Sequence, residues 1–211
     1  MTAPAPPAAR RRTRLSPQVR RDQILDAAAR LILDLGLSAF GMERLARDAG
    51  ISKGLLSAYF PSRDALLAAL LGREQAELRD RGMSTALKAT TFGEVIRRTT
   101  RLYLEQMRDR GALIAPLLDD PSVAGLMEAD NRAERDRTIR YFVRLTRREY
   151  GLSLPLAISA VDLLMAVTGR AGQRVAERSL GLDEAEETCA RIIGGALAAL
   201  AAGSAGSDVG A

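Results

Sequence analysis

The chain has 211 residues, of which 47% are hydrophobic, so it is long enough for one large domain or for a small domain joined to a larger one. It contains no histidine and one cysteine, Cys189, which removes the commonest general base and excludes a disulfide framework. The net charge of +5 arises in the first 60 residues, which carry 10 Lys and Arg against 5 Asp and Glu, whereas the remainder carries 21 of each. A basic segment on a neutral body suits an anionic polymer as partner, and a solvated tail explains the same charge equally well.

The N-terminal stretch MTAPAPPAARRRTR combines Pro and Ala with a cluster of arginines. No apolar core follows it, as a secretory signal would require, and no window approaches the roughly 18 consecutive apolar residues of a membrane span. We therefore expect residues 1–15 to form a disordered basic arm, with no membrane as partner and a reducing, cytoplasmic location for the protein.

Helical periodicity dominates the chain after residue 16, and alternating strand patterns are scarce, so the sequence predicts an all-α fold. The first helix is expected to begin at Ser16-Pro17 and to end at Gly36. Ser52 and Ser62 are expected to cap two of the later helices. The helices expected after the first one cover about residues 42–49, 53–59, 63–81, 92–109, 112–118, 122–149, 156–178 and 184–202.

Further signals mark the breaks between these helices. Residues 82–91 are expected to form a linker or loop, and Asp120-Pro121 is typical of a helix start with Asp as the N-cap. Asp183 and Glu186 have the spacing of a capping box. Residues 204–211, which are small and polar, are expected to form a disordered tail.

The stretch LARDAGISKGLLSAYF, residues 45–60, joins two short helices through a tight turn. Ala46 lets the helices cross closely, Gly50 tolerates the positive φ of the turn, and Leu56 anchors the second helix. Lys53 lies at the N-terminal end of that helix, where the helix dipole favours phosphate, so the helix suits the DNA major groove. The stretch predicts a helix-turn-helix, although an ordinary pair of packed helices contains the same Ala-x3-Gly pattern.

The longer run RDQILDAAARLILDLGLSAFGMERLARDAGISKGLLSAYFPSRDALLAALL resembles the N-terminal domain of the tetracycline-repressor (TetR) family. The resemblance rests on the spacing ILDAAxxLxxxxG followed by LAxxAGISKGxLxxYFPSxxxLL. It implies a three-helix helix-turn-helix DNA-binding domain over residues 16–61 and a helical ligand-binding and dimerisation domain over residues 62–203. It further implies a homodimeric repressor that binds a palindromic operator in double-stranded DNA and responds to a small-molecule effector. A DNA-binding activator or architectural protein on the same fold, without an effector, is the alternative.

By the same resemblance the recognition helix covers residues 52–59, where Lys53 contacts a phosphate, Gly54 lets the backbone approach the duplex, and Tyr59 donates to a phosphate. Leu55 can meet a thymine methyl and Ser57 can bond to either base type, whereas arginines on the preceding helix suit backbone phosphates. Ser57-Ala58 and Gly41 depart from the family pattern of Tyr-His and Thr, which leaves affinity and operator sequence open. The expected DNA interface comprises Arg44, Arg47, Ser52, Lys53, Gly54, Leu55, Ser57 and Tyr59.

The larger domain is expected to hold the effector among its helices. Aromatic and Met side chains suit an adaptable pocket, but each of them also suits an ordinary helical core. Asp162 is a polar exception in an apolar helix and can face a ligand, pair with an arginine or lie at an edge. The candidate pocket residues are Tyr103, Met107, Phe142, Asp162 and Met165.

The last two expected helices contain small residues, GRAG at 169–172 and IIGGALAALAA at 192–202, which allow helix axes to approach closely. Two copies can then form an isologous four-helix bundle, with packing inside one chain as the alternative. The expected dimer interface comprises Gly169, Gly172, Ile193, Gly194, Gly195 and Leu197.

An all-α enzyme is the competing hypothesis. The sequence has no His, no Cys/His cluster, no carboxylate pair of defined spacing and no Gly-rich phosphate loop. We therefore expect no enzyme activity, no metal site and no cofactor.

Overall fold

The computed structural model describes residues 16–207, except for the side chains of residues 124, 127–132, 134 and 204–207. This part of the chain contains helices and no strand, which confirms the predicted all-α fold. The expected basic arm (1–15) and the end of the expected tail (208–211) lie outside the described residues. The elements are α1 (Pro17–Leu35), the 3-10 helix η1 (Leu37–Ala39), α2 (Met42–Asp48), α3 (Lys53–Tyr59), α4 (Arg63–Leu87), α5 (Phe92–Asp119), α6 (Pro121–Tyr150), α7 (Leu154–Ala176) and α8 (Leu182–Ser207).

Most helix ends follow the predicted capping residues. The hydroxyl groups of Ser16, Ser52 and Ser62 accept hydrogen bonds from the third backbone N–H beyond them, at 3.3, 3.1 and 3.0 Å. Asp120 caps α6 through its carboxylate, which accepts from the backbone N–H of Ser122, two residues on, at 3.0 Å. Gly36, with φ +82°, ends α1 at the predicted place.

Two predicted helix breaks are wrong. The expected linker over residues 82–91 is largely helical, because α4 continues to Leu87 and its last turn buries Ala86. The expected break near residue 111 is absent, because α5 passes through Gly111 without interruption. A Cβ atom on Gly111 would lie 2.3 Å from Cβ of Ala176, so this glycine serves the close crossing of α5 and α7.

The C-terminal helix also differs from expectation at both of its ends. α8 begins at Leu182, so Asp183 and Glu186 lie inside its first turns and do not form the predicted capping box. Both carboxylates instead accept hydrogen bonds from Arg101 of α5, at 2.7 Å each. At its other end α8 extends to Ser207, into the expected tail.

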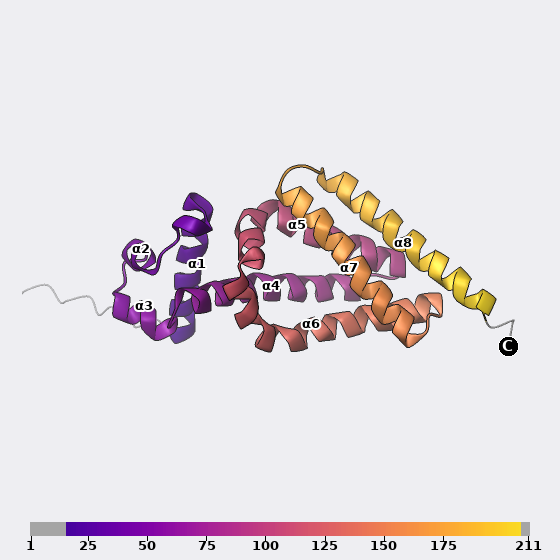
Figure 1. The fold of residues 1–211 in the computed structure, drawn as a ribbon, viewed down its shortest axis with the longest axis horizontal. Helices are drawn as coiled ribbons and strands as arrows, with labels where there is room; N and C mark the ends of the chain where they lie inside the picture. Colours follow the sequence, from indigo (N-terminus) through magenta and orange to yellow (C-terminus); the bar gives the residue numbers. More distant parts are fainter. Residues whose placement is uncertain (1–15, 208–211) are drawn as a thin grey trace, which may run out of the picture.

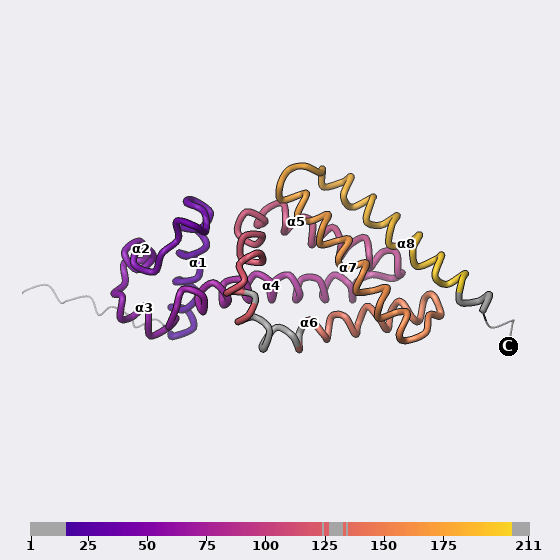
Figure 2. Tube along the Cα trace, viewed as in Figure 1, coloured from indigo at the N-terminus to yellow at the C-terminus, as the bar shows by residue number. Residues whose placement is uncertain are grey.

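The molecule has a head, which we define as α1 to α3, and a body, defined as α4 to α8. Figure 1 shows the head at one end, with α4 leading from it into the body and α8 on the outer side of the body. The trace in Figure 2 follows the same path, in which α5 lies between α4 and α7.

One apolar core runs from the head into the body without a gap. It joins buried residues of α1, Leu45 of α2 and Leu56 of α3 to the first half of α4 and the second half of α5. A second core joins α5, α6, α7 and α8, with Cys189, Ile193 and Leu197 as the part from α8. The head therefore packs directly on α4 and α5. The α4 residues in the first core are Leu66, Leu67, Leu70 and Leu71.

Candidate nucleic-acid interface

The turn between α2 and α3 fixes the position of the predicted recognition helix. Gly50 adopts φ +63°, as predicted, and the N–H of Ile51 donates to the carbonyl of Ala46 at 3.0 Å. Ala46 and Leu56 are both buried, so the small side chain and the apolar anchor close the corner between the helices. This local geometry is that of a helix-turn-helix.

The other end of α3 is held by α1. Phe60, directly after α3, is buried, and the guanidinium of Arg21 lies 4.5 Å from the centre of its ring. Arg21 also donates to the backbone carbonyl of Tyr59, at 3.5 Å. A cation over an aromatic face in a partly buried place is attracted to the ring. The direction of α3 is thus set by α1 through Leu56, Phe60 and Arg21.

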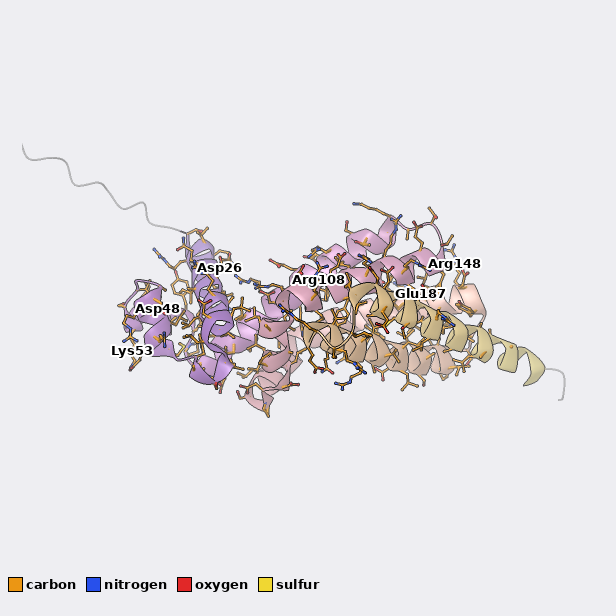
Figure 3. The ribbon with its side chains drawn as sticks, turned by 90° about the horizontal axis from the view of Figure 1, so that it is seen from above. Asp26, Asp48, Lys53, Arg108, Arg148 and Glu187 are labelled. Atoms are coloured by element: carbon orange, nitrogen blue, oxygen red, sulfur yellow. The ribbon has the colours of Figure 1, made fainter. Side chains whose placement is uncertain are left out.

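The outer face of α3 carries almost all of the predicted DNA contacts. Leu56 is the buried residue of this helix, whereas Ser52, Lys53, Gly54, Leu55 and Ser57 are exposed and Tyr59 is half-buried. Arg44 and Arg47 are exposed on the adjacent α2. Figure 3 shows Lys53 and Asp48 at the end of the molecule opposite Arg148 and Glu187. The predicted DNA-binding residues therefore lie on, or directly before, two adjacent helices of the head, α2 and α3.

Gly54 has no packing role within the chain. A Cβ atom built on it would meet nothing within 4 Å, and its φ is not positive. Glycine in a helix is less stable than alanine there by roughly 0.5–1 kcal/mol, and the open space at Gly54 leaves room for the close approach of an external group.

Lys53 is paired with an acidic residue that sequence reasoning missed. Its Nζ atom lies 2.8 Å from Oε1 of Glu43 in α2, and the side chains are 72% and 78% exposed. The hydrogen bond between them, and then their opposite charges, raise the pKa of Lys53 and lower the pKa of Glu43. Glu43 therefore competes with any phosphate for this ammonium group. The contact depends on the angle between α2 and α3, and no spacing rule in the sequence indicates it.

The two arginines of α2 differ in their surroundings. Nε of Arg44 lies 3.9 Å from Oδ2 of Asp48, one turn further along the helix, and both side chains are about half exposed. Arg47 has no ion-pair partner among the described residues, and its charge also lowers the pKa of Glu43. Arg47 is therefore available to an anionic partner without breaking an ion pair.

The five candidate pocket residues do not converge on one place. Tyr103 and Met107 lie on α5 at its crossing with α7, where a Cβ atom on Gly172 would come within 2.5 Å of Tyr103 and 2.9 Å of Met107. Phe142 is half-buried in the second core, on α6. Asp162 and Met165 are exposed on α7, so neither side chain is enclosed within the core.

A cleft that the sequence did not indicate lies between α4 and α5. Its volume is about 290 Å³, and its wall is charged rather than apolar. The buried Glu74 and its partner Arg110 form part of that wall, with Nη2 of Arg110 2.6 Å from Oε1 of Glu74. The lining residues are Glu74, Glu77, Arg81, Glu105, Gln106, Asp109 and Arg110.

The predicted dimer residues divide between the core and the surface. Gly172 packs on Tyr103, and Ile193 and Leu197 are buried in the second core, so these three serve packing inside the chain. Gly195 is exposed, whereas Gly169 and Gly194 are half-buried.

The outer faces of α7 and α8 form an exposed stripe. On α7 the stripe follows helical spacing, and its apolar members Leu154, Ile158 and Met165 are 49%, 47% and 38% exposed. Among the described residues α7 is also the helix that would suit a membrane span by length and composition, but one such helix is weak evidence. Asp162 lies within the stripe. We define the α7–α8 stripe as Leu154, Ile158, Asp162, Met165, Gly169, Thr188, Ile192, Gly195 and Ala199.

Comparisons with known proteins agree with this geometry. Residues 24–70 match the model of the bacterial regulatory proteins of the tetR family. The HTH-type transcriptional regulator BetI of Rhizobium meliloti is 29% identical over 143 residues, which cover 68% of this chain and 66% of BetI. The HTH-type transcriptional activator FasR of Mycolicibacterium smegmatis is 40% identical over 82 residues, or 39% of this chain and 37% of FasR.

Solved structures of similar fold superimpose on this chain over nearly all of their own length. A TetR-like transcriptional regulator from Rhodococcus sp. RHA1 superimposes with a TM-score of 0.66 at 23% identity, covering 88% of this chain and 99% of that one. The transcriptional regulator FadR of Bacillus subtilis, solved in complex with stearoyl-CoA, gives a TM-score of 0.65 at 13% identity, covering 82% and 96%. At these identities the superpositions establish the fold.

Proposed function

Because the chain belongs to the tetR family of bacterial regulatory proteins, we propose that it is a homodimeric repressor that binds a palindromic operator and releases it on binding a small molecule. The observation that carries the proposal is the outer face of α3. It carries an exposed lysine at the N-terminal tip and a glycine with open space above it, whereas Leu56 anchors the opposite face of α3 in the core. Such a surface suits a backbone that approaches closely and bears negative charge.

On the duplex, α3 enters the major groove by its N-terminal end. Lys53 moves from the carboxylate of Glu43 to a phosphate, and Gly54 admits the close approach of the backbone. Leu55 and Ser57 face the bases, where a thymine methyl and a hydrogen-bonding edge are their natural partners. Arg44, Arg47 and Tyr59 contact phosphates on either side, which fixes the register without reading sequence.

The second copy binds through the α7–α8 stripe. α7 exposes large apolar side chains and contacts α8, which carries small residues of the kind that permit close approach of helix axes. An isologous pair of these surfaces buries the apolar groups of both chains and gives the four-helix bundle expected of two such helix pairs. The dimer then presents two α3 helices about 34 Å apart, one turn of the duplex.

The effector acts by changing that spacing. A ligand lowers DNA affinity only when it binds the arrangement with the wrong spacing more tightly than the DNA-bound one. Tyr103 and Met107 at the α5–α7 crossing, with Phe142, are the proposed contacts for an effector within one chain, and Asp162 and Met165 belong with the dimer surface instead. FadR, whose fold this chain shares, was solved with stearoyl-CoA, which supports an effector site in the body. The protein acts in the cytoplasm, where its DNA lies, and needs no enzyme activity.

The experiment that tests the proposal selects duplexes from a random library with the purified full-length chain and measures their binding by fluorescence anisotropy. Palindromic sequences with half-sites one helical turn apart are expected, with affinity that falls steeply as salt rises. Enrichment of no palindrome, or binding that does not depend on salt, would contradict it. Because the relative FasR is named an activator, transcription from a promoter that overlaps the selected site is measured with and without the protein. A decrease supports repression, and an increase supports activation.

A further inference from the structure

The head and the body are joined by a row of charged side chains that crosses three helices. Nη1 of Arg73 in α4 lies 2.8 Å from Oδ1 of Asp26 in α1, and it also donates to the backbone carbonyl of Asp22 at 3.4 Å. The next residue, Glu74, accepts two hydrogen bonds from Arg110 of α5, at 3.0 and 2.6 Å. Nη2 of Arg73 lies 3.9 Å from Oε1 of Glu74, so the Asp26–Arg73 pair is connected to the Glu74–Arg110 pair.

The body side of this row is firmly held. The side chain of Glu74 is 4% exposed, its carboxylate is bound bidentately by Arg110, and its backbone carbonyl accepts from Gln106 at 3.1 Å. Hydrogen bonding and the negative charge of Glu74 hold the pKa of Arg110 above its usual range. A bidentate pair of this kind, with a buried carboxylate, is specific in its geometry.

The head side is more open to solvent. The side chain of Asp26 is 62% exposed, whereas that of Arg73 is 21% exposed. Figure 3 places Asp26 between Lys53 and Arg108 along the length of the molecule. Asp26 lies on the same helix as Arg21, which holds the end of α3. Movement of α1 about the Arg73 contact therefore moves α3 as well.

We propose that Asp26 and Arg73 are positioning residues that set the angle of the DNA-binding head on the body, with the Glu74–Arg110 pair as their fixed support. The apolar core between α1 and α4 supplies most of the attraction, but apolar contact is non-directional and leaves rotation of α1 loosely determined. A charged hydrogen bond at one point of the contact selects one rotation. The effect on DNA binding rests on the proposed function; the effect on the angle of the head does not.

The test compares Asp26→Asn with Asp22→Asn in the full-length protein. Both substitutions remove one negative charge from α1, but the carboxylate of Asp22 accepts from Gln18 rather than from Arg73. Spin labels on Asp34→Cys and Lys88→Cys report the distance from the head to the far end of α4, with labelled protein diluted in unlabelled protein. Cys189 is buried, and burial raises the pKa of its thiol, so it stays unlabelled.

A broader distance distribution is expected in Asp26→Asn than in Asp22→Asn, with rescue in Asp26→Glu. On the full palindrome Asp26→Asn is expected to bind about 3- to 10-fold more weakly than Asp22→Asn, whereas the two bind a single half-site equally, since one head alone needs no fixed spacing. Identical distance distributions in the two variants would overturn the proposal. If the parent protein bound no duplex, the proposed function would fail, and the distance comparison would still decide the role of Asp26.

Replacement of Glu74 is the more direct but more disruptive variant. Glu74→Gln leaves Arg110 partly buried without its counterion, and such a loss can unfold a domain. Asp26→Asn avoids this outcome because Asp26 lies at the surface.

Discussion

The helices α3 and α7 both leave most of their surface outside the core of the chain, but the surfaces are opposite in character. α3 buries Leu56 and exposes mostly polar, cationic and small residues, together with the large apolar side chain of Leu55. α7 buries mainly small residues and exposes large apolar ones, of which Leu163 at 67% is the most exposed. Incomplete burial thus has two different consequences.

An exposed polar surface is stable in water without a partner, so it can bind a partner reversibly. Contacts between lysine or arginine and phosphate replace bound counterions and depend on salt, which makes them reversible. An exposed apolar surface costs about 25 cal/mol per Å² in water and favours a partner that stays. Under the proposed function, the apolar surface of α7 suits a permanent second copy, and the polar surface of α3 suits a transient duplex.

The largest expected effect comes from placing a charge in the α7–α8 stripe. Gly195→Arg puts two guanidinium groups, one from each copy, into an apolar interface, and the cost of several kcal/mol raises the dimer dissociation constant about 1000-fold or more. Light scattering during size-exclusion chromatography measures the mass. Gly93→Arg is the matched control, because Gly93 is also exposed with open space at its Cβ position but lies at the start of α5. An intact Gly195→Arg dimer would remove α8 from the interface.

The next effect concerns the tip of α3. Lys53→Ala removes a charged contact worth about 1.5–3 kcal/mol per half-site, so binding of every duplex is expected to weaken at least tenfold, with a shallower salt dependence and an intact dimer. Lys88→Ala is the control, since Lys88 carries the same charge at the far end of α4. Equal affinity of the two variants would contradict the assignment of α3 as the recognition helix.

The ends of the helices in the head could be predicted from sequence, because a capping residue bonds to backbone groups close to it in the chain. Ser16, Ser52 and Ser62 bond to backbone groups three residues away, and Gly50 is needed for the φ of its own turn. The exposed face of α3 follows from the family pattern together with one apolar anchor. Within the head, therefore, the sequence predicted the turn and the helix ends that place α3, and its DNA contacts stay a prediction.

The partners of small residues could not be predicted in this way. A glycine at helical spacing indicates that another helix packs closely on it. Gly111 packs against Ala176 and Gly172 against Tyr103 of the same chain, whereas the described residues place nothing within 4 Å of a Cβ atom on Gly195. The distinction depends on which helix lies opposite, and that is decided by packing across the whole body. Glu43 was missed for a related reason, since its contact with Lys53 requires the angle between two helices.

Gly54 offers a sharper test of the transient surface. Gly54→Ala fits the open space at α3 and is expected to stabilise the fold by up to about 1 kcal/mol, because alanine favours helix. The methyl group would nevertheless stand between helix and duplex, so DNA binding is expected to weaken about 5- to 10-fold. Thermal unfolding and anisotropy together separate the two effects. Gly93→Ala, at the second position of α5 as Gly54 is of α3, should stabilise the protein similarly and leave DNA binding unchanged.

The smallest expected effect concerns the acidic partner of Lys53. Glu43→Gln frees the ammonium group and removes a negative charge beside the duplex, so affinity for all duplexes is expected to rise about two- to fivefold at low salt, as for an exposed ion pair. Asp34→Asn, an exposed change of equal charge elsewhere in the head, should have less effect.

The pH dependence of that difference identifies its cause. Because pairing with Lys53 lowers the pKa of Glu43, the carboxylate stays charged below the usual range for glutamate, and the advantage of Glu43→Gln persists as the pH falls through that range. It disappears only when the pH passes the lowered pKa, where protonated Glu43 resembles glutamine. Anisotropy titrations of both proteins over this range test the claim. An advantage that vanished already at the ordinary glutamate pKa would mean that Glu43 acts by its charge alone and leaves Lys53 unpaired before DNA arrives.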